Sequence, residues 1–212
     1  DGIRDDLVTG VQTCALPIYL ETKYSAEEVG GWENIEDMGM SVGVIWDSVD
    51  QQFSVYLDHQ TNELVEHCKR SDQIVGFNHV GFDYRVLAGA CHAEAQMRSR
   101  LHTELAGLNN LDMLVELKKV LGHRLKLESV ARSTLGTGKS ADGLQALKWY
   151  REGQYDKIIE YCKIDVEVTR DVHLYALEHG KLHYDSRSGI KTVEVNWKPQ
   201  PPKKEIEQMS LF

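Results

Sequence analysis

The chain has 212 residues, 42% of them hydrophobic and 27% charged, which is typical of one globular domain with a sizeable core. Its formal net charge of −9 excludes binding to nucleic acid by bulk attraction, so action on DNA would require a local basic patch, bound cations or a recruiting partner. No apolar run reaches membrane-spanning length, and the four cysteines form no CxxC pair, which predicts reduced thiols in a cytoplasmic protein and no zinc site.

The first 18 residues differ in character from the rest of the chain. They read DGIRDDLVTGVQTCALPI, without the positive start or small-residue cleavage site of a signal peptide and without a clear period. The string resembles translated sequencing-adaptor read-through of the kind found at the ends of metagenomic gene models. We therefore predict that residues 1–18 are a non-native leader that forms no core-packed strand; a natural but disordered leader is the alternative.

Strands and helices are predicted to alternate in the first half of the remaining chain. Residues 38–46 and 52–57 are rich in β-forming side chains and flank a short polar segment, so they predict an antiparallel hairpin. Residues 61–69 have apolar side chains at helical spacing. Residues 74–77 read as a short buried strand, and residues 82–95 have the spacing of the helix that follows it, with a loop after that helix.

The second half is predicted to be mostly helical. The expected helices are 113–121, 127–135, 143–152 and 155–178, with a last short strand at 193–195. This order predicts an α/β fold with a mixed β-sheet and helices on both faces. The domain is expected to span residues 19–197, and residues 198–212 to form a Pro/Lys-rich linker and a tail.

Acidic residues recur where an α/β fold places groups beside a ligand. Glu21 ends the expected first strand, and Asp83 lies in the first helical turn after a strand. Tyr161 and Asp165 are four residues apart and therefore share one helix face. Oxygen ligands of this kind suit Mg²⁺ or Mn²⁺, two of which can stabilise phosphodiester hydrolysis. The alternative for Asp83 is a carboxylate that only favours the helix dipole.

The order of these motifs resembles that of the DEDD-type 3′–5′ exonucleases of the ribonuclease H-like superfamily, in the group with a Tyr four positions before the last Asp. The N-x-x-x-F-D stretch at residues 78–83 and the KSADGLQAL stretch at residues 139–147 add to the likeness, which covers residues 19–197. The resemblance implies a ribonuclease H-like fold and a metal-dependent 3′–5′ exonuclease that hydrolyses phosphodiester bonds in DNA. An exoribonuclease is the alternative.

Roles follow from the resemblance residue by residue. It implies catalytic residues at Glu21, Asp83, Tyr161 and Asp165. The three carboxylates among them would bind Mg²⁺ or Mn²⁺, Asp83 through metal-bound water, and Tyr161 would position the attacking water. Asn78 matches a polar position near the substrate strand, and Asp112 matches a supporting aspartate, so these two are the expected substrate-binding residues.

One position departs from the family pattern. The family's first Asp, which bridges both ions, falls on Tyr19, beside the suspected leader. An Asp codon and a Tyr codon can differ by one base, so an overwritten codon in a truncated gene is the simplest account; a natural loss of activity is the rival. The chain as written is therefore expected to be nearly inactive.

The C-terminal residues resemble the peptide that docks on the bacterial DNA sliding clamp. The residues that carry the likeness are Gln208, Met209, Leu211 and Phe212, with Ser210 between them. Apolar anchors at the end of a flexible tether suit a groove on a partner, and a clamp would hold an acidic protein on DNA. A chance pentapeptide or a tail that packs on its own domain is the alternative. A catalytically inactive clamp-binding module is the alternative for the whole chain.

Other aromatic and basic residues have more ordinary interpretations. Trp32, Trp46, Trp149 and Tyr150 are expected in the core rather than on a base-stacking surface. The basic residues Lys118, Lys119, Arg124 and Lys126 form either a phosphate path or a solvated face.

Overall fold

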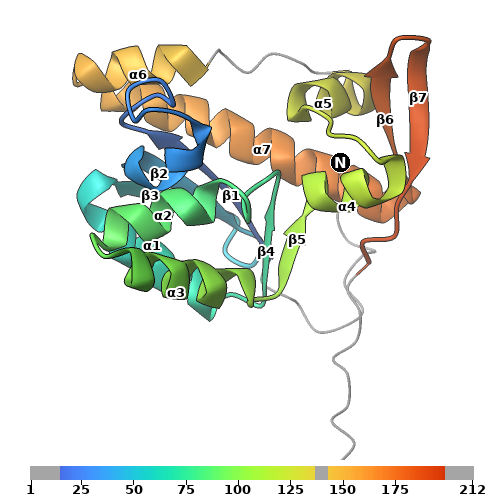
Figure 1. The fold of residues 1–212 in the computed structure, drawn as a ribbon. Helices are drawn as coiled ribbons and strands as arrows, with labels where there is room; N and C mark the ends of the chain where they lie inside the picture. Colours follow the sequence, from blue (N-terminus) through green and yellow to red (C-terminus); the bar gives the residue numbers. More distant parts are fainter. Residues whose placement is uncertain (1–14, 137–142, 199–212) are drawn as a thin grey trace, which may run out of the picture.

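The computed structural model describes residues 15–136 and 143–198, which form two sheets and the helices around them (Figure 1). The strands are β1 (Ala15–Thr22), β2 (Met40–Asp47), β3 (Gln52–Leu57), β4 (Gln73–Gly76), β5 (Asn110–Asp112), β6 (Lys181–Ser186) and β7 (Gly189–Glu194). The α-helices are α1 (Thr61–Arg70), α2 (Asp83–Cys91), α3 (Ala95–Ala106), α4 (Met113–Leu121), α5 (Leu127–Leu135), α6 (Gly143–Arg151) and α7 (Tyr155–His179). Two short 3-10 helices are η1 (Trp32–Asp37) and η2 (Asp58–Gln60).

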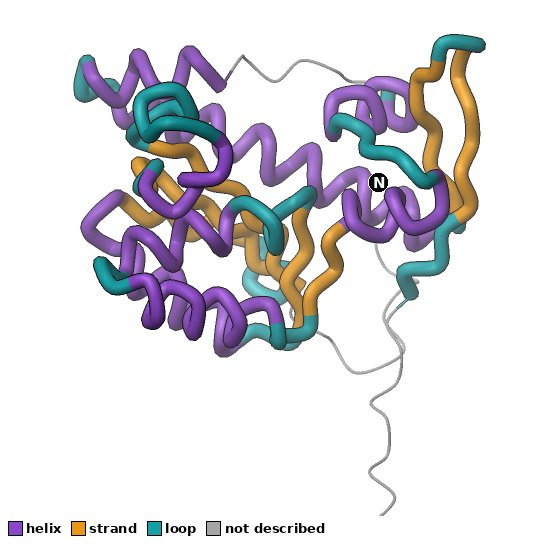
Figure 2. Tube along the Cα trace, viewed as in Figure 1, coloured by secondary structure: helices purple, strands orange, loops and turns teal. Residues whose placement is uncertain are grey.

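A five-stranded mixed sheet with the order β3-β2-β1-β4-β5 forms the centre of the fold. β1 is antiparallel to β2 and parallel to β4, so the first strand lies in the middle. Helices α1 to α3 lie on one side of this sheet and α7 crosses the other side, as Figure 2 shows. The predicted α/β class, with a mixed sheet and helices on both faces, is confirmed.

The alternation of side chains along β1 assigns its two faces. Leu16, Ile18 and Leu20 are buried in the core shared with α1 and α2. Tyr19, between them in sequence, points to the other face and packs on the apolar cluster under α7. β1 therefore presents one fully apolar face and one face that carries the first predicted motif.

The prediction that residues 1–18 form no core-packed strand is wrong for residues 15–18. β1 begins at Ala15, and its side chains Leu16 and Ile18 are fully buried because the slot between β2 and β4 must be filled by an extended segment. Pro17 also lies there, although proline has no N–H for the ladder and is unusual in a central strand. Residues 1–14 lie outside the described residues, and a foreign origin for the leader stays a prediction.

Most predicted elements are found close to their expected bounds. The β2–β3 hairpin, α1, α4, α5 and α7 are confirmed, and Gly122 and Gly136 end α4 and α5 in left-handed conformations. The single helix expected over 82–95 is wrong, because His92 is extended and the chain starts a second helix, α3, in the expected loop. β6 was missed because only Leu182 and Tyr184 are buried in a mostly polar strand.

The β6–β7 hairpin forms a separate two-stranded sheet that packs with α5 and α7. Its core includes Leu182, Tyr184 and Val193 together with Val172 and Ala176 of α7. None of the described helices combines the length and the apolar character needed to cross a bilayer.

Candidate active site

Tyr19 and Glu21 lie on the α7-facing side of β1 because they are two residues apart in a strand. The Tyr19 hydroxyl donates a hydrogen bond to Glu21 Oε1 at 3.1 Å. The pairing of β1 with β2 shifts register between Glu21 and Thr22, an irregularity of the kind that redirects side chains beside active sites. The first motif is therefore held at the end of the central strand, with its two side chains in contact.

The last motif lies across from the first, on α7. The Tyr161 ring packs edge-on against the Tyr19 ring, with 6.2 Å between centroids. Asp165, one turn further along the helix, is buried, and burial raises its pKa to about 6, although hydrogen bonding to the Tyr161 and Tyr19 hydroxyls favours the ionised form. The predicted sharing of one helix face by Tyr161 and Asp165 places both beside β1.

Asp83 joins this group from the other side of the sheet. It begins α2 and is buried, and burial raises its pKa to about 7, opposed by backbone hydrogen bonds at Asp83 itself and at Leu20 of β1. Burial also raises the pKa of Glu21 to about 8; the Tyr19 hydrogen bond opposes this rise, and the charges of Asp165 and Asp83 add to it. Of the three predicted acidic positions, Asp83 and Asp165 therefore both lie near the third, Glu21.

Cys162, a residue that the sequence argument did not single out, lies among the same charges. Burial raises its thiol pKa, and the charges of Glu21, Asp165 and Asp83 raise it further. Its side chain packs in the apolar cluster under α7. The Cys162 thiol is therefore neutral and unreactive, and it forms part of the apolar core next to the carboxylates.

A cavity of about 480 Å³ opens beside these residues. Its lining includes Tyr19, Glu21, Asp83 and Asn78. Its lining also includes the aromatic and aliphatic side chains of Tyr24, Trp32, Phe82 and Leu144. A volume of this size lies in the usual range for a small-molecule site. The cavity therefore combines two of the converging carboxylates with an apolar wall.

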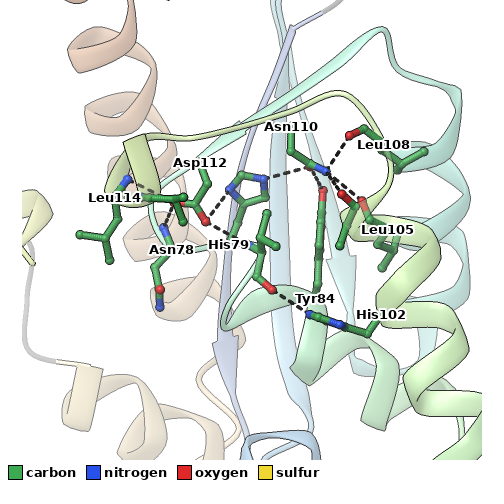
Figure 3. Close-up of polar contacts among 12 residues, drawn as sticks. Asn78, His79, Tyr84, His102, Leu105, Leu108, Asn110, Asp112 and Leu114 are labelled. Atoms are coloured by element: carbon green, nitrogen blue, oxygen red, sulfur yellow. Dashed lines mark hydrogen bonds and ion pairs between the residues drawn. The ribbon is translucent and has the colours of Figure 1, made fainter. Parts of the chain in front are cut away.

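Asp112 holds the loop that leads to Asp83 (Figure 3). Its carboxylate accepts backbone N–H groups from Asn78 at 2.8 Å, Val80 at 3.1 Å, Leu114 at 3.1 Å and Val115 at 3.3 Å. Four such bonds on a buried carboxylate explain both the start of α4 and the path of the 78–82 loop. The contacts of Asp112 are thus those of a supporting residue, and direct substrate contact stays a prediction.

A buried polar chain extends this support, as Figure 3 shows. His79 Nε2 lies 3.1 Å from Asn110 Oδ1, which also accepts a hydrogen bond from the Tyr84 hydroxyl at 2.6 Å. His79 Nδ1 lies 3.6 Å from Asp112 Oδ2, and burial lowers the His79 pKa. The His79 ring is 1% exposed, and its two nitrogens contact Asn110 and Asp112 of β5, so this buried ring connects β5 to the loop before Asp83.

Asn78 lines the cavity and has a left-handed backbone, with φ of 72°. Its Oδ1 accepts a hydrogen bond from Arg124 Nη2 at 3.0 Å. The loop between α4 and α5 therefore brings a guanidinium to the edge of the cavity. In the described part of the chain, Lys118, Arg124 and Lys126 form no ion pair, which favours the phosphate path over a merely solvated face.

The donor chemistry suits a hard divalent cation, because the converging groups are carboxylates and the charges of Asp165 and Asp83 raise the pKa of Glu21. Among residues 15–136 and 143–198, however, no three His, Cys, Asp or Glu side chains are grouped so that they could hold a metal ion. The resemblance predicts a bridging Asp at position 19, where this chain has a phenol. As written, the described residues therefore do not form the expected Mg²⁺ or Mn²⁺ site.

The apolar wall was only partly foreseen from the sequence. Trp46, Trp149 and Tyr150 pack on the cluster under α7, as expected. The expectation for Trp32 is wrong, because its side chain is 67% exposed and lines the cavity. The Gly30-Gly31 turn just before Trp32 signals a surface position but does not reveal the neighbouring cavity. Residues 139–142 of the KSADGLQAL stretch and the tail residues lie outside the described part of the chain.

Two of three comparisons with known proteins found a similar family or structure. The sequence profile of the RNase_H superfamily matches residues 36–177, more than half of the chain and including Asp83, Asp112, Tyr161 and Asp165. No curated protein matches in sequence. The structure is similar to that of the family B DNA polymerase from the hyperthermophilic archaeon Pyrobaculum calidifontis, with a TM-score of 0.55 and 17% identity over 78% of this chain.

The chain covers only 24% of that polymerase, and at this identity the likeness concerns the fold. The profile match runs from the end of η1 through β2 to most of α7, so it covers four of the five strands of the mixed sheet and leaves out β1. The matched residues include three of the acidic positions that structure and sequence single out. On these grounds, the chain belongs to the RNase_H superfamily.

Proposed function

We propose that this domain is a 3′–5′ exonuclease of the Tyr-containing DEDD type that acts on DNA in the bacterial cytoplasm. In the present sequence, Tyr19 makes the enzyme nearly inactive. The observation that best supports this is that Asp83 and Asp165 both lie near Glu21, that Glu21 and Asp83 line a cavity, and that Tyr161 packs on Tyr19. Buried carboxylates that lie close together are unfavourable unless a function retains them.

Electrostatics explain why Tyr19 should abolish activity. A neutral phenol adds no negative charge where the family has a bridging carboxylate, and its hydroxyl already donates a hydrogen bond to one oxygen of Glu21. An Asp at position 19 would supply the missing oxygen ligand for Mg²⁺ or Mn²⁺. Loss of one essential catalytic interaction commonly costs about a hundredfold or more in rate.

The substitution Tyr19→Asp tests the proposal, with Tyr19→Phe as the matched control that removes the hydroxyl without adding charge. Single-stranded DNA labelled at either end, with Mg²⁺, Mn²⁺ or EDTA, reports cleavage and its direction. We expect metal-dependent 3′–5′ cleavage only from Tyr19→Asp. Robust metal-dependent cleavage by the Tyr19 protein would show that the first motif is misplaced. The same assay on single-stranded RNA decides between DNA and RNA.

A second candidate is a catalytically inactive module that binds the sliding clamp. It is favoured by the Tyr19–Glu21 hydrogen bond and by the incomplete metal-binding group in the described residues. Its partner-binding residues would be Gln208, Met209, Leu211 and Phe212, which lie outside those residues. A folded Tyr19→Asp protein that degrades no nucleic acid, but binds the clamp and loses that binding when Leu211 and Phe212 become Ala, would support this candidate.

A further inference from the structure

Three exposed, largely apolar side chains line the cavity. Tyr24 is 49% exposed, and Trp32 and Leu144 are each 67% exposed. They come from three separate parts of the chain, the loop after β1, η1 and the start of α6, yet all line the cavity that contains Glu21 and Asp83. Exposed apolar groups that gather around a cavity mark a binding site more often than chance exposure does.

The backbone beneath Trp32 is firmly anchored although its ring is open to solvent. Arg85 Nη2 of α2 donates to Glu33 O at 2.9 Å. Gly89 of α2 lies so close to η1 that a Cβ there would meet Glu36 O at 1.6 Å. These contacts hold the backbone of η1 in place before any ligand arrives, which lowers the entropic cost of binding at Trp32.

The Trp32 ring also lies next to the candidate catalytic residues. Its centroid is 6.4 Å from that of Phe82, the residue directly before Asp83. A planar group that stacks on Trp32 would lie at the cavity that Glu21 and Asp83 also line. Nucleobases have planar apolar faces and are attached to a phosphodiester, so they match this combination of an aromatic surface and a candidate phosphodiesterase site.

We propose that Trp32, flanked by Tyr24 and Leu144, is a stacking site for one unpaired nucleobase, and that it makes the substrate a single-stranded end. This inference rests on the proposed function. A base in a duplex end must first be unpaired and unstacked, so a site for one separate base favours single strands. Stacking is tolerant of sequence because every base has a π-face, so all four bases should bind, with little discrimination.

Binding to labelled oligonucleotides tests the stacking site without relying on cleavage. The protein with Tyr19 is used in Mg²⁺ at low ionic strength, with a phosphorothioate at the last linkage to block hydrolysis. The oligonucleotides end either in adenine or in an abasic nucleotide. The variants are Trp32→Ala, the conservative Trp32→Phe, and Ile190→Ala as a control, since Ile190 is equally exposed but lies on β7.

We expect Trp32→Ala to weaken binding of the adenine-ended strand about 5- to 150-fold, the range for loss of one base–aromatic stack. Trp32→Phe should retain part of the affinity and Ile190→Ala all of it. The abasic strand should bind the unsubstituted protein and Trp32→Ala equally weakly. If the unsubstituted protein binds the adenine-ended and the abasic strand equally well, the inference is overturned, and this comparison does not depend on any variant. An equal loss of affinity for both strands in Trp32→Ala would also overturn it.

The outcome can be separated from that of the proposed function. If Tyr19→Asp cleaves DNA and the Trp32 variants bind like the unsubstituted protein, only the stacking site is wrong. If Trp32 binds the terminal base but no variant cleaves, the stacking site stands and the exonuclease proposal fails. If Tyr19→Asp also degrades a blunt duplex as fast as a single strand, the preference for single strands is overturned.

Discussion

The Tyr19 hydroxyl donates a hydrogen bond to Glu21 Oε1, 3.1 Å away on the same face of β1. The two polar side chains of the first motif, Tyr19 and Glu21, are therefore hydrogen-bonded to each other. This hydrogen bond favours the ionised form of Glu21, but burial outweighs it and the pKa of Glu21 still rises to about 8. A carboxylate at position 19 would add its charge to those of Asp165 and Asp83 beside Glu21, whereas the neutral Tyr19 adds none.

The Tyr19→Phe variant isolates this hydrogen bond. Removing the hydroxyl takes away a group that lowers the pKa of Glu21, so the pKa of Glu21 should rise above about 8. Carboxyl ¹³C NMR titration measures it directly. The pKa of Asp165 should rise from about 6 as well, because the same hydroxyl favours its ionised form. An unchanged titration of both groups would contradict the hydrogen-bonded arrangement.

Stability without divalent cations should fall as pH rises from about 6.5 to 8. The folded-state pKa values of Glu21, Asp83 and Asp165 are raised to about 8, 7 and 6, so the folded protein binds more protons than the unfolded chain in this window. The stability that these three carboxyl groups contribute is fully present below their unfolded-state pKa near 4, and it is lost as the pH rises through their folded-state pKa values. Chemical denaturation at a series of pH values measures the slope.

The limits of that window are set by other buried groups. Burial lowers the pKa of His173 to about 4, so its contribution is lost as pH falls below about 6.5, which opposes the carboxylates at lower pH. Burial raises the pKa of the Cys68 thiol to about 12, which adds a further loss above about pH 8.5. Asp83→Asn should flatten the slope between these limits, and an unchanged slope in that variant would contradict the assignment.

Asp112→Ala should lower the free energy of unfolding by about 3 kcal/mol, because four backbone N–H groups lose a charged acceptor in a buried site. Asp112→Asn should cost less, since one carbonyl oxygen remains. Glu116→Ala, on the more exposed side of the helix α4 that Asp112 caps, is the control, and its free energy of unfolding should change by no more than about 0.5 kcal/mol. Urea denaturation compares the three. A cost for Asp112→Ala no greater than for the control would refute the supporting role.

Arg124→Ala should weaken oligonucleotide binding to a similar degree for all sequences. Arg124 reaches the cavity edge through Asn78 and has no carboxylate partner among the described contacts, so its charge is available for a phosphate. The slope of log affinity against log salt should fall by about 1 for the loss of one phosphate contact. Arg187→Ala in the β6–β7 turn is the matched control. An unchanged slope would place Arg124 outside the strand path.

Much of the fold was predictable because local rules and tertiary packing agree. The glycine after α4, the four-residue spacing of Tyr161 and Asp165, and the polar break between β2 and β3 each specify their structure locally. In the candidate site, only the residues that belong to the ordered motifs, Glu21, Asp83, Tyr161 and Asp165, were predictable from the sequence. The Arg124–Asn78 contact joins residues 46 apart, and the exposure of Trp32 depends on how η1 packs on α2, so neither has a local signal.

Removal of residues 1–18 should destabilise the domain far more than removal of residues 1–14. The register pairs between β1 and β4 are Ala15 with Gln73, Leu16 with Ile74, and Pro17 with Val75. The shorter protein would lose all of them, together with the buried side chains Leu16 and Ile18. Thermal unfolding followed by circular dichroism compares the two. Equal midpoints would show that β1 can dispense with its first four residues.

This junction also determines when the site can assemble. β1, β2 and β3 are adjacent in sequence and can pair as each emerges, whereas β4 must return to a strand made much earlier. Glu21 precedes that closure and Asp83 follows it, so the carboxylates meet only after the parallel pair has formed. A partly folded or newly synthesised chain therefore has no assembled site, and any hydrolytic activity would appear only in the final, cooperative step of folding.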